Sequence, residues 1–373
     1  MKKYFLLMAV GAIVSSSVQA LVNLGEGQID LNLSVSTYWD SEIRGRDFGQ
    51  EDFVLAVRPS LAYRRSTRNY DFSTSVGLNS VTYMDFSDLD KTDVYFDVDI
   101  SPKKTIETSR FVFTGDLDLN SETQTNDAVG DIVTIRNYAA SAKLVYDPNR
   151  QFTVTGTMGF SRRDPDSDQF FITDRFNAGI SLAKPINKTT MAFGRLGYRD
   201  TKSDGTFSDS TTMTYSAGLS GEILPKLSGS MSAGMQNRDF DGRDSSNSPF
   251  VSAELDYVVD DLTTLGLTAS QGLGTTIDDR SSENLDIRLT ARRDISREMS
   301  GILYIGYRQS DYEGVFSELN RSDEDFLFGA SITYQLVRWG SIGLDFSYVD
   351  RSSDSDQYAH DRTRIGVVFR GRW

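Results

Sequence analysis

Gln28-Ile29-Asp30-Leu31-Asn32-Leu33-Ser34-Val35-Ser36 alternates polar and apolar residues without a break. Successive side chains of a β-strand point to opposite faces of the sheet, so this stretch predicts a strand with one apolar and one polar face. Trp39 extends the apolar face by the same spacing. Runs of roughly ten residues with this alternation recur along the chain. The sequence therefore predicts an all-β fold built from two-faced strands.

Several later stretches repeat the pattern clearly enough to assign the apolar face. These faces contain Phe53, Leu55, Val57 and Leu61; Phe111, Phe113, Leu117 and Leu119; Phe152, Val154, Met158 and Phe160; Met213, Tyr215, Ala217 and Leu219; Phe326, Phe328, Ala330 and Ile332; and Ile342, Leu344, Phe346 and Tyr348. Counting all such runs predicts about 18 strands. The runs near Ala140 and Gly194 are the weakest, and losing or merging one pair would leave roughly 16 strands.

The composition fits strands that cross a membrane. The 373 residues are 38% hydrophobic, with 30 glycines, 7 prolines and a formal net charge of −14. No run after the N-terminus approaches the roughly 18 apolar residues that a spanning helix needs. A closed antiparallel up-and-down transmembrane β-barrel needs apolar residues only on the lipid face of each strand. The absence of cysteine excludes disulfides, zinc–thiolate sites and cysteine nucleophiles.

The N-terminus has the features of an export signal. Lys2 and Lys3 precede an apolar stretch over residues 4–14, and small residues at Val18 and Ala20 fit a cleavage site. We therefore predict a cleaved signal peptide over residues 1–20. The mature chain, residues 21–373, is predicted to be a single barrel domain in the outer membrane of a Gram-negative cell, reached through the periplasm.

The connectors between the predicted strands alternate in length. Short ones such as 147–150 and 224–226 alternate with long ones such as 120–130, 237–248 and 271–283. Bacterial barrels have short periplasmic turns and longer outer loops, and an even strand count places both termini on the periplasmic side. None of the long connectors stands out as a plug that folds into the barrel. A propeller would repeat a blade motif and a sandwich would have shorter strands, so both alternatives fit less well.

The last nine residues carry a second signal. Ile365, Val367 and Phe369 alternate with polar or small residues, and the chain ends on Trp373. This ending resembles the C-terminal strand signal by which outer-membrane proteins are recognised for insertion. The usual last residue of that signal is phenylalanine, so tryptophan is a departure. We predict that these four residues form the membrane-insertion signal, with the barrel-assembly machinery as a partner.

Three stretches near the C-terminus carry a family resemblance. Residues 306–312, 344–358 and 361–367 resemble the outer-membrane β-barrel porins of the second type, which are often associated with exopolysaccharide operons. The resemblance implies a channel that passes small hydrophilic solutes or an exported polysaccharide by passive diffusion. It also implies outer-membrane lipid, lipopolysaccharide and polysaccharide-export components as partners. It supplies no catalytic residue and no cofactor.

Charges inside the strands indicate which residues line a pore. A charge facing lipid at the membrane midplane costs about 2–4 kcal/mol, so strand charges are expected on the inner face. The predicted pore-lining residues are Asp97, Asp99, Asp116 and Asp118 and, elsewhere on the ring, Arg288, Arg292, Arg308, Arg364 and Arg370. The acidic strands and those near residues 288 and 304 would lie almost opposite one another. Our hypothesis is a transverse field that orients charged solutes; the alternative is that these charges only hydrate the lumen.

Other functions find little support in the sequence. His360 is the only histidine and lies in an outer connector, where we expect it to be exposed rather than catalytic. Acidic clusters in the outer connectors are interpreted as hydrated surface, so no metal site is predicted. No phosphate-binding loop or basic nucleic-acid patch is present. A non-conducting scaffold or secretion-system partner and, less favoured, a barrel hydrolase are the alternatives to a channel. Inward tyrosines Tyr83, Tyr95 and Tyr304 would favour sugars if they formed a track.

Overall fold

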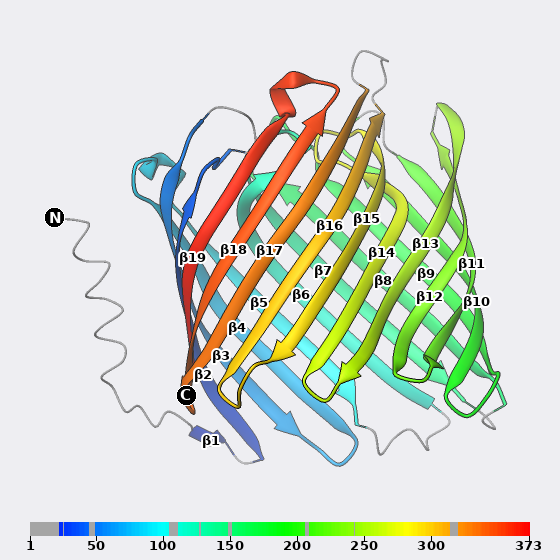
Figure 1. The fold of residues 1–373 in the computed structure, drawn as a ribbon. Helices are drawn as coiled ribbons and strands as arrows, with labels where there is room; N and C mark the ends of the chain where they lie inside the picture. The colour runs from blue at the N-terminus through cyan, green and yellow to red at the C-terminus, as the bar shows by residue number, and fades with distance from the viewer. Residues whose placement is uncertain are drawn as a thin grey trace.

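The strands close into a ring. The computed structural model describes residues 22–24, 26–44, 49–103, 111–126, 128–147, 151–205, 209–241, 243–313 and 320–373. Within these ranges, each strand from β2 to β19 pairs antiparallel with the next, and β19 pairs with β2. Figure 1 shows the resulting barrel of tilted strands. The eighteen long strands confirm the expected fold and strand count.

The long strands have the following bounds: Gly27–Asp40 (β2), Asp52–Ser66 (β3), Tyr70–Tyr83 (β4), Lys91–Pro102 (β5), Phe111–Asn126 (β6), Asp131–Tyr146 (β7), Thr153–Pro165 (β8), Thr173–Pro185 (β9), Thr190–Ser203 (β10), Ser210–Leu224 (β11), Leu227–Phe240 (β12), Arg243–Asp260 (β13), Thr263–Thr275 (β14), Ser281–Asp294 (β15), Met299–Glu313 (β16), Arg321–Val337 (β17), Gly340–Ser353 (β18) and His360–Arg372 (β19). The weakest sequence patterns, near Ala140 and Gly194, lie in β7 and β10.

Small elements complete the described part of the chain. A three-residue strand, β1 (Val22–Leu24), pairs with the start of β2, and two short 3₁₀ turns cover Ser87–Leu89 (η1) and Asp356–Tyr358 (η4). Helices long and apolar enough to cross a membrane are not found among the described residues. The predicted signal peptide, residues 1–20, lies outside the described residues.

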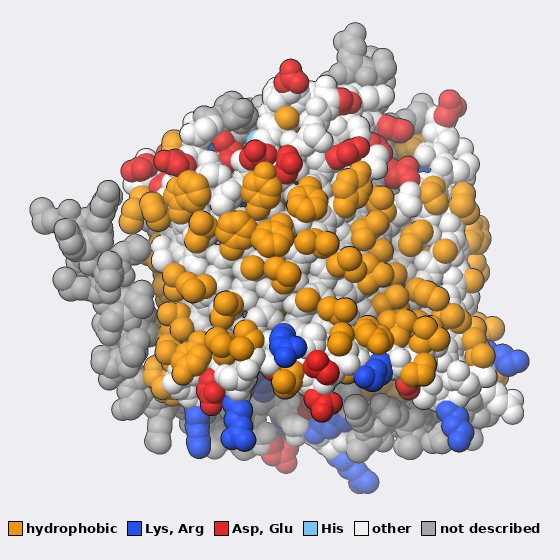
Figure 2. All heavy atoms as spheres, viewed as in Figure 1, with side chains coloured by type: hydrophobic (Ala, Val, Ile, Leu, Met, Phe, Trp, Pro, Cys, Tyr) orange, Lys and Arg blue, Asp and Glu red, His pale blue; other side chains and the backbone are white. Residues whose placement is uncertain are grey.

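The outer surface of the barrel carries an apolar belt. Large apolar side chains such as Leu289, 50% exposed, point away from the lumen. Figure 2 shows these side chains as a continuous band, with acidic side chains along its upper edge and lysines and arginines below it. An exposed apolar surface of this extent is stable only against lipid. The belt therefore marks the membrane-spanning part of the wall.

Two connectors that the sequence predicts to be long are short. β6 continues to Asn126 and β7 begins at Asp131, while Phe240 of β12 pairs directly with Arg243 of β13. The predictions of long loops over residues 120–130 and 237–248 are therefore wrong. Alternation fails as a guide here because strands that rise above the lipid no longer need an apolar face, although their backbone groups still pair.

The seam between the first and last long strands is fixed by a buried carboxylate. Asp30 of β2 is 1% exposed, and it accepts hydrogen bonds from Arg64 of β3 and, over 2.9 Å, from Arg372 of β19. Gln28 donates a further hydrogen bond to Asp30 over 2.7 Å. One carboxylate thus links three neighbouring strands where the ring closes, and charge-assisted hydrogen bonds of this kind are the stronger ones.

Candidate pore and its constriction

The strand register places the nine predicted pore-lining residues on the inner face. Residues directly opposite in a ladder share a face, and Arg288 pairs with Gly306 while the adjacent Leu289 pairs with the outward Ile305. Every other member of the set likewise alternates with residues that face the lipid, so it points inward. The inward residues include Asp97, Asp99, Asp116, Asp118, Arg288, Arg292, Arg308, Arg364 and Arg370. Whether they steer solutes remains a hypothesis.

Four of these residues form an acidic wall, defined as Asp97, Asp99, Asp116 and Asp118. Asp97 lies directly opposite Asp118, and Asp99 opposite Asp116, across the ladder between β5 and β6. Their hydrogen-bond donors are neutral: Ser75 donates to Asp97 over 2.7 Å. Among the described residues, none of the four forms an ion pair. Like charges facing each other destabilise a ladder, so this wall is costly to the fold.

The predicted arginines differ in how far they are neutralised. Arg308 contacts Asp286 and Asp325, at 3.3 and 3.5 Å, and Arg364 contacts Asp40 at 2.7 Å. Arg288 instead stacks over the ring of Tyr304, with 4.9 Å between the guanidinium carbon and the ring centroid. Arg308 therefore lies beside two carboxylates, whereas Arg364 shares its one carboxylate with Arg362.

Several inward arginines, Arg292 among them, form no ion pair among the described residues. We call three of these, Arg58, Arg288 and Arg370, the arginine trio. Arg58 was not among the predicted pore-lining residues, although its place on the polar face of β3 contained the signal. Its Nε donates to Asn79 over 2.8 Å. β15, which carries Arg288, lies nine strands from β6 and so directly across the ring from the acidic wall.

A cavity runs along one side of the lumen. It has a volume of about 640 Å³ and is lined by β2–β4, β6 and β16–β19. Arg58, Arg370, Tyr304 and two carboxylates, Glu122 and Asp345, reach it. A smaller cavity of about 250 Å³ lies nearer the outer mouth, along β16–β19. The open part of the lumen therefore follows this arc of the wall.

The end of β14 and the connector to β15 fold into the lumen, and we call residues 273–280 the strap. Ile277 is 1% exposed and packs in an apolar cluster that includes Val133 of β7. Arg280 donates from Nη2 to the carbonyl oxygen of Ala128 over 2.8 Å. β14 lies eight strands from β6, so the strap crosses the mouth almost from wall to wall.

The expectation that no connector folds into the barrel is therefore wrong. The strap has one large apolar residue after Leu273, namely Ile277, between Thr276 and Asp278. Nothing in that local composition distinguishes a docked connector from a hydrated one. Its docking partners, such as Val133 and Ala128, are more than a hundred residues away in sequence, and only the closed ring brings them together.

Arginines from four strands hold the strap by its backbone, and we call Arg163, Arg175, Arg199 and Arg238 the arginine cluster. Arg163 and Arg175 both donate to the carbonyl oxygen of Thr275, over 3.5 and 3.1 Å. Arg199 and Arg238 donate to the two preceding carbonyl groups, over 3.3 and 2.8 Å. The sequence analysis missed all four residues. Their places on the polar faces of β8, β9, β10 and β12 were the only available signal.

Comparison with known proteins agrees with this geometry. Residues 189–372 match a family model described as "Putative beta-barrel porin 2". The C-terminal part of the chain is therefore similar to this porin family. None of the curated protein sequences compared with the porin matches it.

Solved structures share the porin's fold over nearly its whole length. OpdK from Pseudomonas aeruginosa, solved with vanillate, is 10% identical, with a TM-score of 0.51 and coverage of 92% of this chain and 99% of that one. OpdO from the same organism is 12% identical, with a TM-score of 0.51 and coverage of 94% and 98%. OccAB3 from Acinetobacter baumannii is 8% identical, with a TM-score of 0.50 and coverage of 94% and 100%. The porin is thus an outer-membrane β-barrel of the channel-forming type.

His360 of the porin is not exposed, which corrects the expectation from its sequence. It is the first residue of β19, is 9% exposed and lines the smaller cavity. Its Nδ1 lies 3.0 Å from the carbonyl oxygen of Tyr358. The inward-facing start of β19 explains the burial, because His360 pairs with the inward Arg351.

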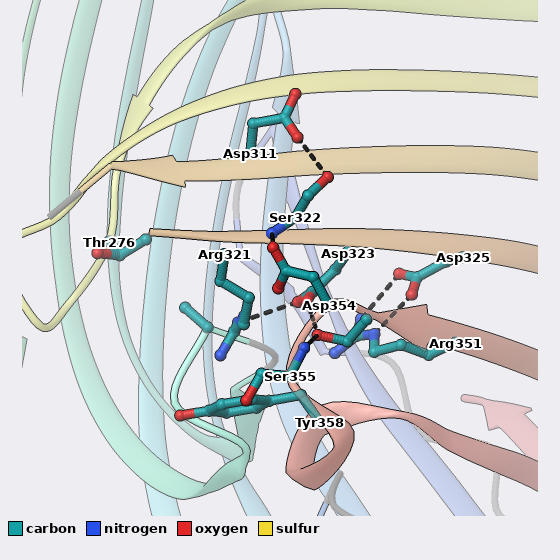
Figure 3. A network of polar contacts seen from close by, with 12 residues as sticks. Thr276, Asp311, Arg321, Ser322, Asp323, Asp325, Arg351, Asp354, Ser355 and Tyr358 are labelled. Carbon is teal, nitrogen blue, oxygen red and sulfur yellow. Dashed lines mark hydrogen bonds and ion pairs between the residues drawn. The ribbon is translucent and has the colours of Figure 1, made fainter. Parts of the chain in front are cut away.

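A polar network stabilises the outer end of the porin's wall beside the strap. Figure 3 shows Arg321 above the ring of Tyr358, and their separation is 3.6 Å from guanidinium carbon to ring centroid. Arg321 also contacts Asp323 at 3.0 Å, and Arg351 makes a two-pronged contact with Asp325, at 2.5 and 2.7 Å. Paired charges and a stacked cation fix this side of the mouth.

The residues of the predicted insertion signal occupy the last strand of the porin. Ile365 and Val367 are exposed on the lipid face, whereas Phe369 and Trp373 are buried. The ring of Trp373 stacks on Trp339, with 5.1 Å between centroids. Recognition of this strand by the assembly machinery stays a prediction.

Proposed function

We propose that this porin passes small hydrophilic solutes and orients charged ones with an electric field across the lumen. The observation that carries the proposal is the separation of uncompensated charges. Among the described residues, the acidic wall on β5 and β6 has no ion pair, and neither has Arg288 on β15 directly across the ring. Rings and walls of charge in a narrow aqueous pore sort ions by sign and position.

The size of the open path favours small solutes over a polysaccharide chain. The strap crosses the outer mouth, and the cavity along β2–β4, β6 and β16–β19 has a volume of about 640 Å³. Of the three tyrosines expected to form a sugar track, Tyr83 and Tyr304 line this cavity, whereas Tyr95 lies against Gly77 and is not in its lining. The OpdK structure that resembles this fold was solved with vanillate, a small solute. Vanillate is therefore a suitable first test solute for this porin.

Neutralising the acidic wall and neutralising the arginine trio should shift ion selectivity in opposite directions. Changing the four aspartates of the acidic wall to asparagine should raise the chloride-to-potassium permeability ratio by roughly threefold, because cations lose their attractive wall. Changing the arginine trio to glutamine should lower the same ratio by about as much. The measurement is the reversal potential of single porins in a potassium chloride gradient across a planar bilayer.

A matched control uses Arg338→Gln, an exposed arginine in the turn between β17 and β18. This variant should keep the wild-type reversal potential, because its charge lies outside the lumen. Unchanged selectivity in both the aspartate variant and the arginine-trio variant would refute the field. The charges would then serve only to hydrate the lumen.

We infer that the porin is not a hydrolase. His360 contacts a backbone carbonyl oxygen, and its cavity also contains Arg308, Arg351, Arg362 and Arg364. Among the described residues, the His360 ring contacts no serine hydroxyl and no carboxylate that could complete a nucleophile–base pair. Purified porin should therefore release neither fatty acid from phospholipid nor fragments from a peptide. Hydrolysis that His360→Ala abolishes would contradict this inference.

A further inference from the structure

We propose that the arginine cluster is a binding site for a multivalent oxyanion, and that binding there releases the strap and widens the pore. The site is not part of the field proposed above, because its members contact the strap rather than the open cavity. It would respond to phosphate-bearing or polycarboxylate solutes. The porin would then open further in the presence of such a solute.

The guanidinium groups of the arginine cluster offer more hydrogen-bond donors than the neutral oxygens around them can accept. Two guanidinium groups, from Arg163 and Arg175, share one neutral acceptor, the carbonyl oxygen of Thr275. Arg199 has only the Leu273 carbonyl oxygen and the Asn177 side chain. Within the described ranges, no carboxylate pairs with these three arginines. Half-buried cations held only by neutral oxygens are a favourable place for an anion to bind.

The four strands that carry the arginine cluster lie close together in the wall. Arg163 pairs with Thr173, two residues before Arg175, and Arg199 pairs with Thr212, which in turn pairs with Arg238. The guanidinium groups therefore converge on one short stretch of backbone. Planar guanidinium forks match the oxygens of phosphate and carboxylate, and charge-assisted bonds are roughly twice as strong as neutral ones. An oxyanion would compete directly with the strap carbonyl groups.

The strap can move out of the lumen without unfolding the wall of the barrel. β14 leaves β13 after Gln271, so no pairing with β13 holds the strap. Its release costs only the pairing of residues 273–275 with β15, and the ladder below them stays closed. Beyond the cluster, the strap is held by the burial of Ile277, by Arg280 and by the 2.8 Å hydrogen bond from Phe171 to the Ile277 carbonyl oxygen. These contacts are few, and loops with few contacts open at low free-energy cost.

The test is single-channel recording of the full chain with inorganic phosphate replacing chloride at constant ionic strength. Phosphate should shift the wild type to a state with about twice the conductance, because the strap no longer covers its part of the mouth. The variant Arg163→Gln/Arg175→Gln/Arg199→Gln should show the higher conductance already in chloride and no further response to phosphate. Arg195→Gln is the matched control, since Arg195 lies inward on β10, over Phe193, without touching the strap. It should behave as the wild type.

A second variant keeps the cluster intact. Ile277→Cys/Val133→Cys places a thiol pair across the apolar contact that anchors the strap, in a chain that has no other cysteine. Cross-linking should hold the lower conductance in phosphate, and reduction should restore the response. Wild-type conductance that is unchanged or lowered by phosphate would overturn the proposal, as would a full response in the cross-linked porin. These readouts are current amplitudes, so they are distinct from the reversal potentials that test the field.

Discussion

Deleting Trp373 is expected to reduce the assembled barrel in the outer membrane by at least tenfold. The backbone of Trp373 makes two hydrogen bonds to Leu31, each 2.9 Å long, and its ring stacks on Trp339. Net contributions of about 1 kcal/mol for each hydrogen bond and about 1 kcal/mol for the aromatic pair give roughly 3 kcal/mol at the ring closure. The measurement is the heat-modifiable, folded fraction on gels of isolated outer membranes.

The variant Trp373→Phe separates recognition from packing. It keeps the backbone hydrogen bonds and restores the usual terminal residue of an outer-membrane strand, so it should assemble at close to the wild-type level. Assembly of the deletion variant at the wild-type level would show that the terminal residue contributes neither to the insertion signal nor to closure.

Leu289→Arg should lower the free energy of unfolding by about 2–4 kcal/mol, because the substituted side chain would face hydrocarbon. Leu289 is half exposed on the apolar belt, next to Ile305 of the neighbouring strand. The measurement is unfolding of the porin in lipid vesicles by increasing denaturant, followed by tryptophan fluorescence.

The adjacent residue provides the control. Thr290 points into the lumen, opposite Tyr304, so Thr290→Arg should cost less than about 1 kcal/mol in the same assay. A change of one position along the strand thus reverses the environment of the new charge. Equal destabilisation by the two arginines would contradict the assignment of the lipid and lumen faces.

Local alternation was enough to predict the ring, and the reason is physical. A strand that faces lipid needs an apolar residue at every second position. The alternation in stretches such as 28–36 therefore shows which side of the strand faces the lipid. Even the weak patterns near Ala140 and Gly194 form strands, since their neighbours leave their backbone groups no other partners. The inward placement of residues such as Asp97 and Arg288 follows from the same parity.

The constriction could not be predicted in this way, because it depends on contacts between distant parts of the chain. Ile277 meets Val133, and the Thr275 carbonyl oxygen meets Arg163, only after the ring has closed. For the same reason, the sequence could not show which inward arginines contact a carboxylate. Arg364 and Arg288 look alike in sequence, yet the first contacts Asp40 and the second stacks over Tyr304.

Single-channel recording of the purified, refolded mature chain in a planar bilayer tests the central claim most directly. A closed barrel with an open path beside the strap predicts discrete, stepwise increases in current in potassium chloride. Folded protein that inserts into the bilayer and never produces such steps would contradict the claim.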